Sequence, residues 1–82
     1  DVAPAAPVHV LMIPKAHTEN IITAEPELLL YMFGKVKELA EKLGVNEKGF
    51  RIVANTGDDG GQTVKHLHIH LLGGKALGWP PC

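Results

Sequence analysis

The chain has 82 residues, with eight lysines and arginines against nine aspartates and glutamates, and a net charge of −1 when its histidines are neutral. This length predicts one domain with a small core, and the balanced charge argues against a nucleic-acid-binding protein, which would carry a basic face. The sequence has no apolar run of roughly 18 residues, so we expect no membrane span, and its first residues predict no secretory signal. The single cysteine, Cys82, excludes an intrachain disulfide, so we expect a reducing, cytoplasmic location.

The first predicted element is a strand over residues 8–13, because the run VHVLMI is apolar and β-branched and a proline follows it. Side chains of a strand alternate between its two faces, so His9 is expected to point away from Val8. Residues 15–22 form a polar connection, in which His17 is expected to be a solvated loop residue.

The clearest element is one helix, predicted over residues 25–43. Pro26 and the acids on either side of it suit a helix start, apolar side chains recur at helical spacing, and Gly44 supplies a C-terminal stop. Inside a helix Gly34 costs about 1 kcal/mol relative to alanine, so we expect it to mark a close packing contact.

Two further strands are predicted over residues 50–54 and 64–72, separated by a polar, glycine-rich loop over residues 55–63. The order strand, helix, strand, strand predicts an α+β domain built on an antiparallel sheet. We expect residues 1–82 to form one domain, whose small core makes oligomerisation a natural route to further burial.

Three histidines alternate with apolar residues in the predicted strand 64–72. His66, His68 and His70 are therefore expected to project from one face as a row of imidazoles about 6–7 Å apart. The other face is expected to pack on the helix with its aliphatic side chains, Leu67, Ile69 and Leu71. Imidazole titrates near neutral pH and serves as a base, an acid, a nucleophile or a metal ligand. Three desolvated imidazoles are expensive in a structural strand, so the row predicts an active centre.

The loop before this strand adds a possible anion site. Gly57, Gly60 and Gly61 permit backbone conformations in which successive amides converge on an anion, and Gln62 and Thr63 offer side-chain donors. An ordinary hairpin loop is the competing interpretation, because Asp-Gly is itself a turn signal. Phosphate binding is favoured because the loop leads directly into the histidine strand.

Two more polar residues are candidates for the same site. His9 is expected to face the same pocket if its strand neighbours the histidine strand. Asn55, at the end of the second strand, is expected to orient an imidazole or bind a ligand hydroxyl, with turn capping as the alternative.

Residues 66–72 (HLHIHLL) fit the pattern His-X-His-X-His-X-X with apolar X, and through it the chain resembles the histidine triad superfamily of nucleotide hydrolases and transferases. Further segments resemble its Hint branch, the histidine triad nucleotide-binding proteins. These are residues 1–4 (DVAP), Pro7, His9, residues 13–15 (IPK), Asn55, residues 60–64 (GGQTV), residues 73–74 (GG) and residues 79–81 (WPP).

The resemblance implies a specific fold and activity. Hint proteins are homodimers whose two five-stranded antiparallel sheets join into one continuous sheet. They bind purine nucleoside monophosphates such as AMP and GMP, and hydrolyse phosphoramidates such as AMP linked to an amine. The residue matching His68 attacks phosphorus and forms a nucleotidyl-histidine intermediate, and neither a metal nor a cofactor is required.

The resemblance also assigns roles by position. Asp1 would bind the ribose hydroxyls, and Val2 would line the nucleoside pocket. The remaining nucleotide contacts would come from Asn55, Gly61, Gln62, Thr63, Ile69 and His70, the last of which would hold the phosphate. His66 and His9 would complete the imidazole cluster, and Trp79 would reach the site of the partner subunit.

The chain departs from the family pattern at three places. Family members have further strands before the position of Asp1, so we expect an N-terminally incomplete domain. Thr63 stands where many relatives have serine, and Cys82 stands where glycine is common. Three alternatives stay open: a non-catalytic nucleotide-binding or regulatory interaction module, a dinucleoside polyphosphate hydrolase, and a zinc hydrolase built on the histidines.

Overall fold

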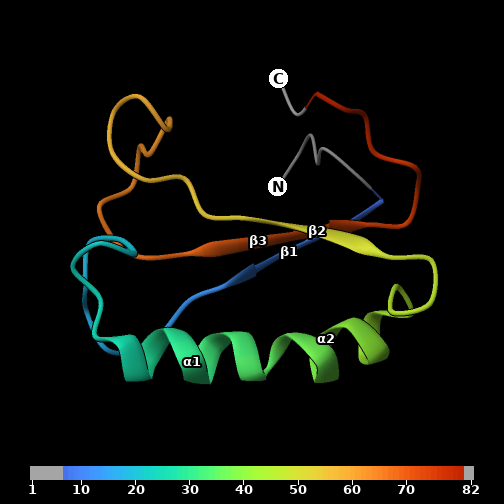
Figure 1. Cartoon of the computed structure of the whole chain (residues 1–82), viewed down its shortest axis with the longest axis horizontal. Coiled ribbons are helices and arrows are strands. Elements are labelled where there is room, and N and C mark those ends of the chain that lie inside the picture. The colour runs from blue at the N-terminus through green and yellow to red at the C-terminus, as the bar shows by residue number, and fades with distance from the viewer. Residues whose placement is uncertain (1–6, 81–82) are drawn as a thin grey trace.

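An antiparallel sheet of three strands, with β3 between β1 and β2, forms the centre of the computed structural model, which describes residues 7–80. In chain order the elements are β1 (Val8–Met12), α1 (Pro26–Gly34), α2 (Val36–Leu43), β2 (Phe50–Val53) and β3 (Ile69–Gly73). Both helices cover one face of the sheet, and the loop after β2 and the tail after β3 rise from the opposite face (Figure 1). The predicted α+β architecture on an antiparallel sheet is confirmed.

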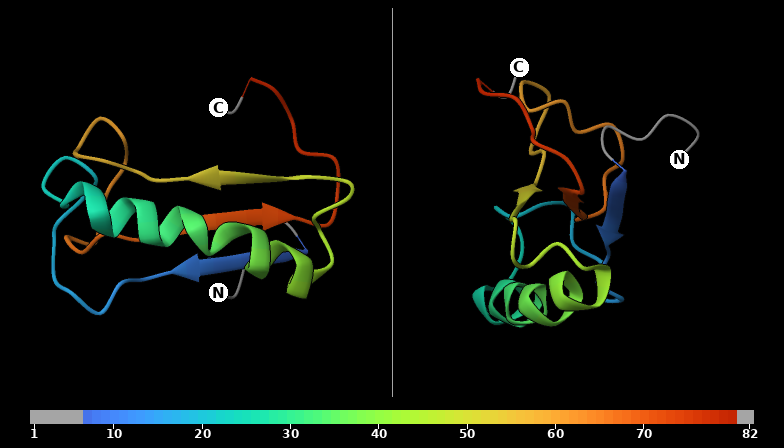
Figure 2. Two further views of the ribbon diagram at one scale, coloured as in Figure 1. Left: turned by 60° about the horizontal axis from the view of Figure 1, so that its bottom comes forward. Right: turned by 90° about the vertical axis from the view of Figure 1, so that its right-hand side faces the viewer.

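The strand register decides which side chains face the helices. Val10 pairs with Leu71, and Leu11 pairs with His70, across the β1–β3 ladder. Directly paired residues point to the same face, so Leu11 and His70 share the face away from the helices. Figure 2 shows this layering, with β3 between its two neighbours and the helices on one side.

The core lies between β3 and the helices, in two clusters. Leu67 and Ile69 pack with Met32 of α1, and Leu71 packs with Ala40 of α2 and with Val45. Ile69 and Leu71 are fully buried, and each buried aliphatic side chain of this size stabilises the fold by about 1.5–3 kcal/mol. The prediction that Leu67, Ile69 and Leu71 pack toward the helix is confirmed.

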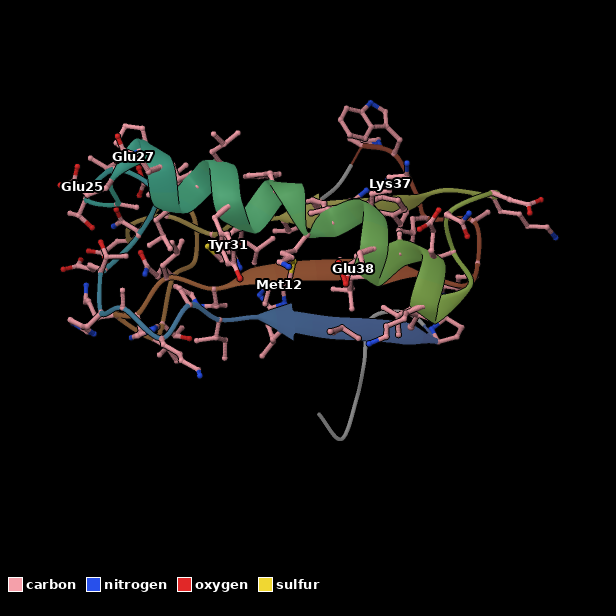
Figure 3. All side chains as sticks on the ribbon, turned by 90° about the horizontal axis from the view of Figure 1, so that it is seen from below. Met12, Glu25, Glu27, Tyr31, Lys37 and Glu38 are labelled. Carbon is pink, nitrogen blue, oxygen red and sulfur yellow. The ribbon has the colours of Figure 1, made fainter. Side chains whose placement is uncertain are left out.

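The prediction of one continuous helix was wrong in one respect, since Lys35 separates α1 from α2. The Lys35 N–H donates to Met32 O at 3.1 Å, a tight turn that interrupts the α-helical hydrogen bonds. Gly34 does not mark a close contact either, because a Cβ there would meet nothing within 4 Å. The predicted ends hold: Glu25 and Glu27 flank the start (Figure 3), and Gly44 ends α2 with φ +73°.

The third strand begins later than predicted, at Ile69, so residues 64–68 were wrongly assigned to it. The reason is that the ladders with its neighbours, β1 and β2, end at this point. The β1 ladder ends at the pair Met12 and Ile69, and the β2 ladder ends one residue further along β3. The other two strands each end one residue earlier than predicted. Before Ile69 the backbone instead bonds to the connection after β1, where the Leu67 N–H donates to Thr18 O at 2.8 Å.

A hollow of about 400 Å³ lies on the flank where α1 faces β1, and Met12 and Tyr31 line it from the two elements (Figure 3). Across residues 7–80, none of the helices has the length and apolar character that spanning a membrane would demand.

Candidate active site

Imidazoles from two neighbouring strands meet on the sheet face away from the helices. His9 Nε2 of β1 lies 2.9 Å from His70 Nδ1 of β3, so one ring donates and the other accepts. The rings of His68 and His70 stand edge to face with their centres 5.2 Å apart. The prediction that His9 faces the pocket of the histidine strand is confirmed, because β1 pairs with β3.

The surroundings of His70 favour its neutral form. Burial lowers the pKa of His70 below its ordinary value, and the charges of the nearby His68 and His9 rings lower it further. Both causes act against adding a proton, since a charged imidazole would lose water and meet like charges. At neutral pH His70 is therefore a neutral hydrogen-bonding group.

The proton of His68 is placed by the backbone. His68 Nδ1 lies 2.8 Å from His66 O, and a carbonyl oxygen only accepts, so Nδ1–H is the donor. In the neutral ring the lone pair then resides on Nε2. This tautomer suits a nucleophile that attacks through Nε2.

His66 lies outside β3 but lines one hollow together with His68, so it stays on the predicted face. Its ring turns to the connection after β1, where Nε2 donates to Pro14 O at 3.1 Å and Nδ1 lies 2.9 Å from His17 Nδ1. Leu67 beside His66 is buried in the core, so the alternation of side chains continues before the start of β3. His17 is exposed as expected, but it contacts the site through His66, which the sequence offered no signal to find.

The side chain of Gln62 holds the glycine-rich loop instead of projecting a donor from it, so that part of the prediction needs correcting. Gln62 is buried, and its Oε1 accepts from the Gly57 N–H at 3.0 Å and from Asn20 Nδ2 at 3.3 Å. Its Nε2 donates to Glu19 O at 2.7 Å and to Val64 O at 3.0 Å. A buried amide needs these partners, so Gln62 ties the loop to the connection after β1.

The loop amides also bond internally, contrary to the predicted convergence on an anion. The Gly61 N–H donates to Asp58 O and the Gln62 N–H to Gly57 O, each at 3.0 Å. Glycine is required for the turn itself, since a Cβ at Gly60 would meet the Thr56 backbone oxygen at 2.4 Å. The loop is therefore a self-bonded turn that leaves Thr63 exposed where it ends.

Two hollows flank the histidine face. One of about 390 Å³ is lined by His66 and His68 and by aliphatic side chains, namely Leu11, Ile13 and Val64. The other, of about 500 Å³, lies between β2 and the C-terminal tail, and Asn55 lines it with Arg51 and Leu72. Asn55 thus lines the hollow beside β2, whose lining includes none of the histidines.

The tail is attached to β2 through Arg51, a residue that no sequence motif singles out. Arg51 Nη2 donates to Gly78 O at 2.8 Å, and its guanidinium carbon lies 5.9 Å from the centre of the Trp79 ring. Trp79 itself is 81% exposed. The predicted ribose and nucleoside contacts of Asp1 and Val2, and Cys82, lie outside the described residues.

Between residues 7 and 80, no three or more histidine, cysteine, aspartate or glutamate side chains are grouped so that they could hold a metal ion.

Comparison with known proteins shows which family and which relatives the sequence resembles. Residues 1–77 match the HIT domain family. An uncharacterised HIT-like protein of Synechococcus elongatus is 56% identical over 84 residues, covering 99% of this chain and 73% of the relative.

Solved structures show the same fold. A HIT family hydrolase from Legionella pneumophila superposes with a TM-score of 0.92 at 44% identity, covering all of this chain and 76% of the other. A histidine triad nucleotide-binding protein from Candida albicans superposes with a TM-score of 0.65 at 29% identity, covering 98% of this chain and 64% of the other.

Proposed function

Since the chain belongs to the HIT domain family, we propose that it is a hydrolase of the Hint type that cleaves the phosphorus–nitrogen bond of purine nucleoside phosphoramidates. The observation that carries the proposal is the hydrogen bond from His68 Nδ1–H to the His66 carbonyl, which leaves the Nε2 lone pair for attack on phosphorus. The family hydrolase from Legionella pneumophila, which matches over the whole chain, supports hydrolysis as the reaction class.

The proposed reaction has two displacements at phosphorus. His68 Nε2 forms a bond to phosphorus while the bond to the amine breaks, and the departing nitrogen takes up one proton. Thr63, exposed at the end of the loop, is the candidate hydroxyl for relaying that proton. Water then attacks the nucleotidyl-histidine, releases the nucleoside monophosphate and returns His68 to its neutral form. Covalent catalysis of this kind divides one difficult displacement into two easier ones.

His70 is proposed to hold the phosphoryl oxygens. Of the two proton arrangements across the 2.9 Å contact with His9, we assign the one in which His9 Nε2–H donates to His70 Nδ1. His70 Nε2–H is then available to an anionic oxygen, and such donors stabilise the charge that develops in the transition state. The lowered pKa of His70 fits a role as a neutral donor and not as an acid.

The rest of the substrate is proposed to occupy the two hollows. The aliphatic hollow beside His68 suits a flat, apolar group such as a purine base, with Asp1 and Val2 completing the nucleoside side. Asn55 is proposed to bind ribose or phosphate from the other hollow. Gln62 and Gly61 would act by shaping the loop, and Trp79 would reach the site of a partner subunit in a homodimer.

The test is release of a fluorescent amine from its adenosine phosphoramidate. His68→Ala should abolish turnover, while the affinity for AMP and GMP stays within about tenfold, or 1.4 kcal/mol, of the parent. The matched control is Lys65→Ala, an exposed residue in the same segment, which should keep the parent rate. Amine release by His68→Ala at the parent rate would contradict the nucleophile, and AMP binding without any release by the parent would show a non-catalytic nucleotide-binding module.

A further inference from the structure

Three hydrogen bonds join the connection after β1 to residues 66–67, just before β3. The pairs are Pro14 O with His66 Nε2 at 3.1 Å, His17 Nδ1 with His66 Nδ1 at 2.9 Å, and Thr18 O with Leu67 N at 2.8 Å. β3 begins at Ile69, so strand pairing does not orient this part of the backbone. The connection after β1 therefore sets the direction of the His66 carbonyl, which is the acceptor for His68.

The positions of the ring protons on His66 and His17 follow from the carbonyl oxygen of Pro14. Pro14 O only accepts, so His66 carries its proton on Nε2, and in the neutral ring its Nδ1 is an acceptor. His17 must then donate through Nδ1–H across the 2.9 Å contact. With both ring nitrogens bonded, the side chain of His66 is held in one orientation.

We propose that His17 is a positioning residue for the nucleophile, acting through His66. The inference depends on the proposed function in one respect, namely that His68 attacks phosphorus. Without the His17 donor, the bonds to Pro14 O and Thr18 O still hold this segment, but the ring of His66 keeps one of its two anchors, so the His66 carbonyl is held less firmly against His68 Nδ1. The bond from His68 Nδ1–H to this acceptor is then weaker, and the ring shifts in part toward the tautomer with its proton on Nε2, which cannot attack through that nitrogen.

The experiment compares His17→Ala with His17→Asn, because the asparagine side-chain N–H takes the place of the imidazole Nδ1–H. His17→Ala should lower kcat about tenfold with little change in KM, as expected for a misplaced reacting group, and His17→Asn should restore most of the loss. Lys15→Ala is the matched control, exposed on the same connection, and should leave kcat unchanged.

A second measurement does not depend on turnover. Long-range ¹H–¹⁵N spectra of the imidazoles should show His68 protonated on Nδ1 in the parent and in His17→Asn, and a gain of the Nε2–H form in His17→Ala. A parent-like His68 spectrum in His17→Ala would overturn the inference, as would an equal loss of kcat in both variants. Should the parent release no amine, the proposed function fails, while these spectra still decide whether His17 positions His68.

Discussion

At the scale of single residues, His70 is the clearest case of a side chain whose protonation the fold controls. It lies between His9 and His68, and burial together with these neighbours lowers its pKa. The unfolded chain has no such neighbours, so there its histidines titrate at about 6.5. At His70 the unfolded state therefore binds more protons than the folded state as pH falls from about 6.5 toward the lowered pKa.

This difference predicts how stability depends on pH. The contribution of His70 is fully present above about pH 6.5 and is lost as pH falls through the lowered pKa of the folded state, because protonation then favours unfolding. His70→Gln should reduce the drop in the unfolding midpoint between pH 7.5 and pH 5.5, measured by urea titration. Lys65→Ala should keep the parent drop, and an unchanged drop in His70→Gln would contradict a lowered pKa for this imidazole.

At the scale of the elements, Gly34 and Gly60 differ in the space that an added side chain would have. Gly34 ends α1 with nothing within 4 Å of an added Cβ, whereas a Cβ at Gly60 would meet Thr56 backbone atoms at 2.4 and 2.8 Å. Backbone atoms cannot rotate away as a flexible side chain can. The two sites should therefore respond oppositely to one added methyl group.

Gly34→Ala should stabilise the protein by up to about 1 kcal/mol, because it restores helix propensity and restricts the unfolded chain. Gly60→Ala should destabilise it by about 1–3 kcal/mol, because the loop has to shift to remove the clash. Urea unfolding of the two variants and the parent measures both changes in the free energy of unfolding. A stabilising Gly60→Ala would mean that the loop is looser than its contacts indicate.

The elements also show how far the sequence predicts this fold and site. Periodicity and stop signals identify the sheet, the helical region and the core side chains Leu67, Ile69 and Leu71, because these depend on local patterns. The start of β3 depends on where its neighbours end, and the sequence does not state that. His66 lies before that start, and the sequence does not show that its ring bonds to the connection after β1.

Long-range polar contacts were the least predictable part of the site. From the sequence, Gln62 is expected to be a donor in a glycine-rich loop. Its partners Glu19 and Asn20 precede the helices in the chain, whereas Gln62 follows them. Pairing of His17 with His66 spans 49 residues and follows no local pattern. The nucleotide contacts of Asp1, Val2 and Thr63, which rest on family resemblance, stay predictions.

For the whole molecule, the sheet is the feature that favours assembly. Ile69, Leu71 and Leu67 are the large side chains with the least exposure among residues 7–80, and a small core of this kind gains from further burial. β2 is an edge strand whose sequence, FRIV, carries one charge, on Arg51. β1 is the other edge strand, and edges with few charges pair readily with a second copy.

We therefore expect self-association through β2, which would extend the sheet across two copies as the Hint resemblance implies. Sedimentation velocity should show a dimer for the parent at micromolar concentration and a monomer for Val53→Lys, because lysine opposes edge pairing. The control is Ile22→Lys, at a position that is 80% exposed outside the strands, which should remain dimeric. A monomeric parent, or a dimeric Val53→Lys, would argue against this edge.

The junction between the connection after β1 and residues 66–67 has a consequence for folding. Its partners are brought together from opposite sides of the helical region, so closing it costs more chain entropy than forming a local turn. Strands and helices can thus form before the nucleophile has its acceptor. The Leu67 amide, bonded to Thr18 O, reports on that last step, and its rate of hydrogen–deuterium exchange measures how often the folded protein holds an unassembled active centre.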